Sequence, residues 1–161
     1  MESNKKLFKD IVLRFAEESK CESKKVAALA VKNNRIVSTG INGTTSKYIN
    51  CCDHFSNVYK ELKLDISYID WKKTSNWREM HHAWSNIHEI HAETNMVIEA
   101  SKNQITLQGC DIYVSLQPCE HCVKLLISLG VKNIYYVNAY DKTKPESMDL
   151  LKKCKINIEQ I

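Results

Sequence analysis

No run of apolar residues in this 161-residue sequence approaches the roughly 20 that a helix needs to cross a bilayer. The first ten residues, MESNKKLFKD, also lack the apolar stretch of a secretory signal. Arginine is scarce, with only Arg14, Arg35 and Arg78 among 23 basic residues, and the net charge of +4 forms no basic stripe that could follow a nucleic-acid backbone. We therefore expect a cytoplasmic protein whose partners include neither a membrane nor a nucleic acid.

The composition is otherwise that of an ordinary globular protein. Apolar residues make up 43% and charged residues 26% of the chain, which excludes a disordered, collagen-like or coiled-coil protein. The length suits one compact domain, so we expect a single unit over residues 1–161. The seven cysteines are odd in number, and the expected compartment is reducing, so a disulfide framework explains them poorly. Metal binding explains them better.

The apolar periodicity predicts the regular elements. An amphipathic helix is expected first, followed by a hairpin whose first strand is apolar on both faces. Strands and helices then alternate, which indicates crossover connections and a sheet covered on both sides. Helices are predicted at about 4–18, 90–103, 119–129 and 145–151, and strands at about 26–31, 36–41, 111–115, 133–137 and 156–158. The expected fold class is α/β: a three-layer α/β/α sandwich around a central mixed five-stranded sheet.

Periodicity fades between about residues 42 and 88. This stretch contains all three tryptophans, four of the six histidines and the Cys51-Cys52 pair. Because so long a segment without regular structure is uncommon inside a compact domain, we expect an insert at about 45–88 that something other than an apolar core organises. Its aromatic residues are expected to form a small satellite cluster.

The sharpest motif is His91-Ala92-Glu93, followed 28 positions after its histidine by Pro118-Cys119-Glu120-His121-Cys122. One imidazole and the two thiolates of Cys119 and Cys122 are three zinc ligands, which leave the fourth position open to water. Glu93 lies in another direction around the helix and is free to move protons. This H-x-E and P-C-x-x-C pattern is typical of zinc deaminases.

Two other interpretations remain open at this point. His121 could complete a closed four-ligand site, in which case the domain is a zinc-stapled interaction module without chemistry. Alternatively, the zinc site could deaminate cytosine or adenine within single-stranded nucleic acid or tRNA, although the scarce arginine and dispersed lysine argue against a groove for such a substrate.

Further segments narrow the comparison with known families. They are Val26-Ala27-Ala28, the stretch 35–44, the stretch 50–54 and His88-Glu89-Ile90. With the zinc motif, these residues make the chain resemble the cytidine deaminase superfamily and, more narrowly, the deoxycytidylate (dCMP) deaminases of the phage type. The resemblance implies a cytidine deaminase-like fold and hydrolysis of dCMP to dUMP and ammonia, which supplies thymidylate synthesis. It also implies the host cytoplasm as the location if a phage encodes the protein.

The resemblance implies roles for individual residues. Zinc would be bound by His91, Cys119 and Cys122, and Glu93 would carry protons. Asn42 would bind the deoxyribose hydroxyl or the base with Thr44 beside it, while Ser115 and Leu116 would line the base pocket. Ser23 and Lys24 would contact the phosphate, where many relatives carry an arginine. The residue set implied for substrate binding is thus Asn42, Thr44, Ser115, Leu116, Ser23 and Lys24.

Regulation is implied as well. The segment Gly40-Ile41-Asn42-Gly43 resembles a Gly-Tyr-Asn-Gly element that belongs to a nucleotide site between subunits. In that family dCTP with Mg²⁺ activates and dTTP inhibits a homo-oligomer, a hexamer. Ile41 replaces the tyrosine of this element.

A second, structural zinc is the last implication of the resemblance. Its ligands would be Cys21, Cys51 or Cys52, His81 or His82, and Glu89, and the preferred set is Cys21, Cys51, His81 and Glu89. A closed four-ligand site contributes folding free energy that a small apolar core cannot supply. Such a site would explain how the insert stays ordered.

Overall fold

The computed structural model describes residues 2–161 and contains a five-stranded mixed sheet. The strand order is β2-β1-β5-β6-β7, in which β1 runs antiparallel to both neighbours while β5, β6 and β7 are parallel. The strands are β1 (Ala27–Lys32), β2 (Arg35–Ile41), β5 (Asp111–Leu116), β6 (Asn133–Asn138) and β7 (Asn157–Gln160). The mixed sheet is as predicted.

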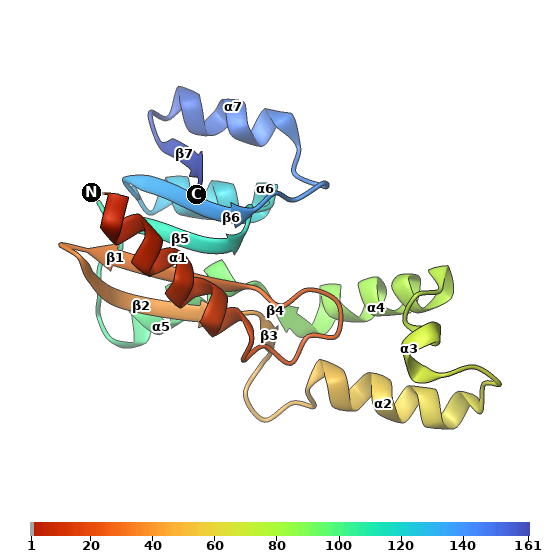
Figure 1. Cartoon of the computed structure of the whole chain (residues 1–161). Coiled ribbons are helices and arrows are strands. Elements are labelled where there is room, and N and C mark those ends of the chain that lie inside the picture. The colour runs from red at the N-terminus through yellow and green to blue at the C-terminus, as the bar shows by residue number, and fades with distance from the viewer. Residues whose placement is uncertain (1) are drawn as a thin grey trace.

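Helix α1 (Glu2–Ala16) covers one face of this sheet, in front of the strands in Figure 1. Alternate residues of β1 point toward it, as expected for a strand buried on both faces. The buried residues of this layer are Phe8, Val12, Ala16, Ala27, Leu29, Val31, Tyr113 and Tyr135.

Helices α5 (Ala92–Lys102), α6 (Glu120–Ser128) and α7 (Pro145–Lys153) cover the opposite face. Met96 of α5, Leu126 of α6 and Leu151 of α7 are fully buried against the sheet. The three-layer α/β/α sandwich is therefore confirmed, with ends that differ from the predicted ones by a few residues. The helix predicted from about residue 90 begins at Ala92, because Glu89–Ile90 forms the short strand β4.

The predicted insert, residues 45–88, is helical and is called the arm here. It contains α2 (Cys51–Leu62), α3 (Tyr68–Trp71) and α4 (Ser75–His88), which extend away from the sheet in Figure 1. A two-stranded ribbon of β3 (Gly43–Thr44) and β4 joins the arm to the sandwich. No helix among residues 2–161 is long and apolar enough to cross a membrane.

The arm has a small aromatic core of its own, which corrects the expectation that no apolar core organises it. Phe55, Trp71 and Trp77 are buried, and Trp84 packs against them. The Phe55 and Trp77 rings meet edge to face with their centroids 5.8 Å apart. The predicted satellite cluster of aromatic residues is thus present.

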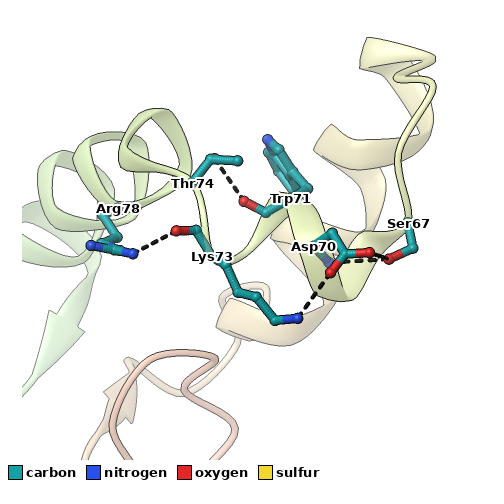
Figure 2. Close-up of polar contacts among 6 residues, drawn as sticks. All are labelled: Ser67, Asp70, Trp71, Lys73, Thr74 and Arg78. Atoms are coloured by element: carbon teal, nitrogen blue, oxygen red, sulfur yellow. Dashed lines mark hydrogen bonds and ion pairs between the residues drawn. The ribbon is translucent and has the colours of Figure 1, made fainter.

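Hydrogen bonds at the helix caps hold the turn between α3 and α4 (Figure 2). Ser67 Oγ accepts the N–H of Asp70 at 3.1 Å and so caps the start of α3. Thr74 Oγ1, at the N-cap of α4, donates to the Trp71 carbonyl at 2.7 Å, and Lys73 Nζ lies 2.9 Å from Asp70 Oδ1. Local capping therefore fixes the four-residue helix α3 and the start of the 14-residue helix α4.

Candidate active site

The residues of the His-x-Glu and Pro-Cys-x-x-Cys motifs meet at the N-termini of two helices. His91 is the N-cap of α5 and Cys119 is the N-cap of α6, while Cys122 lies in the first turn of α6. The positive ends of the helix dipoles favour thiolate ligands at this point. Strand β5 delivers the Cys119 turn, and β4 delivers His91.

The distances between the three side chains fit a single metal ion, and we call them the catalytic cluster. His91 Nδ1 lies 3.5 Å from Cys119 Sγ and 3.4 Å from Cys122 Sγ. Bonds of about 2.0 Å to nitrogen and 2.3 Å to sulfur that meet at a tetrahedral angle place the two ligand atoms roughly 3.5 Å apart. These residues therefore fit a zinc ion, and the His91 side of the cluster is exposed to solvent.

The Cys119 thiol is prepared to ligate a cation. The hydrogen bond with the Cys122 thiol lowers the pKa of Cys119 to about 3, and the His91 ring acts in the same direction. A thiolate is the form of cysteine that binds metals. His121, the alternative fourth ligand, is not part of the cluster.

Glu93 lies beside the cluster without joining it. Its side chain is only 4% exposed and is in hydrogen-bonding contact with the Cys122 thiol. Burial raises the pKa of Glu93, because desolvation disfavours the carboxylate. A carboxyl group of raised pKa next to an open metal position is suited to accept and donate protons.

Helix α5, which carries Glu93 and has His91 as its N-cap, packs directly against the backbone of β2. A Cβ atom on Gly40 would lie 2.2 Å from the Ala92 carbonyl oxygen and 2.3 Å from the Met96 nitrogen. Asn95 Nδ2 also donates to the Ile41 carbonyl at 2.7 Å. Glycine at position 40 is therefore needed for the close approach of the helix.

A second group of ligand atoms, which we call the arm cluster, joins the arm to the loop after α1. Cys21 Sγ lies 3.6 Å from His81 Nε2 and 3.4 Å from Glu89 Oε2, and Cys51 Sγ lies 3.4 Å from the same His81 atom. All four ligand atoms are within 4.8 Å of one another. The structure thus brings together the preferred set, and the alternatives Cys52 and His82 are not part of the group.

The electrostatics of the arm cluster also suit a cation. The Cys51 thiol lowers the pKa of Cys21 to about 3, whereas burial, together with the Cys21 thiolate, raises the pKa of Glu89 to about 7. Glu89 Oε1 is buried and has no hydrogen-bond partner within the described part of the chain. A tetrahedral ion bound by two thiolates, one imidazole and one carboxylate would satisfy these groups.

Comparison with known proteins also indicates a zinc-binding site of the deaminase type. A family model described as the cytidine and deoxycytidylate deaminase zinc-binding region matches residues 1–138. The chain belongs to this deaminase family. The deoxycytidylate deaminase of Enterobacteria phage T4 is 35% identical over 89% of this chain and 82% of the relative. The enzyme of the same name from phage T2 is also 35% identical, over 89% of this chain and 84% of the relative.

Solved structures agree with this membership. The dCMP deaminase from the cyanophage S-TIM5 in apo form has a TM-score of 0.73 at 25% identity and covers 100% of this deaminase chain and 99% of its own. The structure of the same cyanophage enzyme with dCMP and dUMP has a TM-score of 0.74 at 26% identity, over 100% and 98% of the two chains. The resemblance to phage-type dCMP deaminases and the expected fold class are both confirmed.

Asn42, expected at the substrate, has most of its side-chain amide engaged within the deaminase itself. Its Oδ1 accepts from the Val26 N–H at 2.8 Å and from Ser19 Oγ at 2.7 Å. Its Nδ2 donates to the Lys24 carbonyl at 2.8 Å. Asn42 therefore holds the loop that carries Lys24, and one amide hydrogen remains for a ligand.

Lys24 and Ser23, expected at the phosphate, are exposed on this loop. The Lys24 ammonium lies 4.4 Å from the centroid of the Tyr140 ring and 3.6 Å from Asp141 Oδ1. Tyr140 is half-buried, and besides burial the negative charge of Cys119 raises its pKa. Sequence reasoning missed Tyr140, which this electrostatic interaction connects to the catalytic cluster.

The residues expected around the base have mixed surroundings. Ser115 is 3% exposed, and its Oγ accepts the Ala27 N–H at 3.0 Å while its carbonyl accepts from Asn138 Nδ2 at 2.9 Å. Leu116 is half-buried at the end of β5. Thr44 belongs to β3 and pairs with Glu89 of β4. Their contact with substrate stays a prediction.

Proposed function

We propose that this protein is a zinc-dependent dCMP deaminase that converts dCMP and water to dUMP and ammonia. One observation carries the proposal: three ligand atoms with tetrahedral spacing lie beside a buried carboxyl group at two helix N-termini. The choice of dCMP is supported by the 26% identical cyanophage enzyme, whose structure contains dCMP and dUMP.

His91, Cys119 and Cys122 would hold the zinc ion in this reaction. A zinc ion held by these three ligands would lower the pKa of a bound water from about 15.7 to about 7. Glu93 would accept a proton from the attacking water and deliver it to the ring nitrogen N3, and it would then accept the second proton from the oxygen added at C4 and deliver it to the amino group. The water oxygen adds to C4 while the N3=C4 double bond becomes single, and the bond from C4 to the amino nitrogen then breaks as C4=O forms and ammonia leaves.

The loop that Asn42 holds would bind the rest of the nucleotide. Lys24 supplies an ammonium group for the phosphate, and the remaining Asn42 amide hydrogen faces the deoxyribose or base. Ser23, Thr44, Ser115 and Leu116 complete the set carried over from the resemblance. This arrangement predicts a preference for the monophosphate over the free nucleoside.

The arm cluster would hold a second, structural zinc, and residues 1–161 would act as one deaminase domain with residues 45–88 as its stapled insert. The support is the fit of the four ligand atoms and the unpartnered Glu89 Oε1. A metal in a closed site of this kind adds to the free energy of folding.

Regulation by dCTP, with Mg²⁺, as activator and by dTTP as inhibitor is proposed for a homo-oligomer, a hexamer. The support is the segment 40–43, which resembles the family's nucleotide element. Gly40, one of the two glycines of this segment, also packs against α5. Its presence is therefore explained by packing, even if no nucleotide effector binds.

One panel of assays tests the proposal. Loss of absorbance on deamination would be followed with dCMP, deoxycytidine, dCTP and a single-stranded oligonucleotide, each with and without dCTP or dTTP as effector. Zinc content would be measured on the same preparations. Turnover of dCMP above the other substrates is expected, whereas turnover of the oligonucleotide alone would favour the nucleic-acid deaminase.

A further inference from the structure

The two clusters of ligand atoms are joined by a very short piece of backbone. Glu89 belongs to the arm cluster and His91 to the catalytic cluster, so Ile90 alone lies between them. Helix α4 ends at His88, β4 consists of Glu89 and Ile90, and α5 begins at Ala92. With no loop between these elements, a shift of Glu89 reaches His91 within two peptide units.

The position of Glu89 depends on its partners in the arm cluster. Its Oε2 lies 3.4 Å from Cys21 Sγ, and its buried Oε1 has no hydrogen-bond partner among the described residues. The Cys21 thiol donates a hydrogen bond to this oxygen, and a bound cation would replace that single contact with bonds to all four ligand atoms of the cluster. A bound ion would therefore tie Glu89, and with it β4, to Cys21, Cys51 and His81.

On the N-terminal side of His91, the short strand β4 is the element that determines where this residue lies. It is the N-cap of α5, but its side chain makes no capping hydrogen bond, and its ring is exposed. Its ring contacts Cys119 and Cys122, the other two ligands. The backbone that leads into His91 is held by the pairing of β4 with Gly43 and Thr44 of β3.

We propose that a zinc ion in the arm cluster positions His91 and thereby raises the affinity of the catalytic cluster for zinc, so that the two sites load cooperatively. The inference rests on the proposed function in treating both clusters as zinc sites, and it does not depend on the reaction. Coupling between binding sites is reciprocal, so one factor describes the effect of each ion on the other. We expect a factor of about 10, inside the usual range for coupled sites.

Zinc titration of the full chain against a chromophoric chelator measures this factor. The variant Cys21→Ser/Cys51→Ser leaves only the catalytic cluster, and Cys119→Ser/Cys122→Ser leaves only the arm cluster. The overall constant for two ions in the unmodified protein should exceed the product of the two single-cluster constants about 10-fold. A ratio of one, or a single zinc per unmodified chain, overturns the proposal.

Folding of the variants is measured separately, by tryptophan fluorescence. All three tryptophans lie in the arm, so tryptophan emission reports arm packing. If Cys21→Ser/Cys51→Ser shows unfolded emission, Glu89→Gln replaces it, because that change keeps the length of the side chain. The matched control is His82→Ala, next to a ligand on α4 but exposed, which should leave both zinc constants unchanged.

No step of the titration uses turnover. Cooperative loading by a protein that fails to deaminate dCMP would reject the proposed function and keep this inference. Independent loading by an active enzyme would reject the inference alone.

Discussion

Replacing Gly40 with alanine tests whether the close docking of α5 builds the site. The new Cβ would lie 2.2 Å from the Ala92 carbonyl oxygen, 2.3 Å from the Met96 nitrogen and 2.9 Å from the Met96 Cα. All three are backbone atoms of α5, so no side-chain rotation relieves the overlap. Restoring an ordinary contact of about 3.5 Å requires the start of the helix to move by roughly 1 Å.

The expected cost follows from this displacement. Overpacking costs about 1–3 kcal/mol, and a clash with backbone belongs near the upper end. For a domain of this size, about 3 kcal/mol corresponds to a fall in Tm of roughly 6–12 °C. Ala92 lies between His91 and Glu93, and a 1 Å misplacement of catalytic groups lowers activity about 100-fold.

Thermal unfolding by circular dichroism and the dCMP assay would be run on Gly40→Ala and on Gly43→Ala. A Cβ on Gly43 would meet nothing within 4 Å, so the free energy of unfolding of that variant should change by less than about 0.5 kcal/mol. If Gly40→Ala keeps the Tm and activity of the unmodified protein, the docking argument is wrong.

Three further outcomes are expected. Glu93→Gln should lower kcat for dCMP by about 10²–10⁴-fold while zinc content stays the same, because a proton carrier is lost but no ligand; unchanged turnover would contradict the mechanism. Prolonged chelation should shift tryptophan emission to longer wavelength as the arm loosens, and added zinc should reverse it; a constant spectrum would argue against a metal in the arm cluster. Lys24→Ala should raise KM for dCMP about 10-fold, as expected for loss of a charge-assisted hydrogen bond, and leave KM for deoxycytidine unchanged; equal effects on both substrates would show that Lys24 does not contact the phosphate.

The sandwich and the catalytic cluster were predictable because their signals are local. Strands such as β1 reveal themselves by their apolar residues, and the spacing of Cys119 and Cys122 within one helical turn places two ligands on one face. The His-x-Glu motif similarly fixes a ligand and a neighbouring carboxyl group on α5. Each of these inferences needs only a few adjacent residues.

The arm and the tight docking of α5 were not predicted, for two different reasons. The arm helices carry a readable signal that was missed, because Cys51, Phe55 and Tyr59 recur at helical spacing in α2 and Ser67 and Thr74 are recognisable caps. The packing of Gly40 on Ala92 and the placement of Tyr140 both depend on how distant elements meet. Tertiary contacts of this kind leave no periodic trace in the sequence.

The hydrogen bonds of Asn42 have a consequence for chemical ageing. An asparagine followed by glycine is prone to spontaneous loss of its amide, because the next backbone nitrogen attacks the side-chain carbon with little steric hindrance. In this protein, contacts with Val26, Ser19 and Lys24 hold the amide in place and oppose that attack. Conversion to aspartate would put a second acceptor opposite the Lys24 carbonyl, so the loop should separate from β2 in aged preparations.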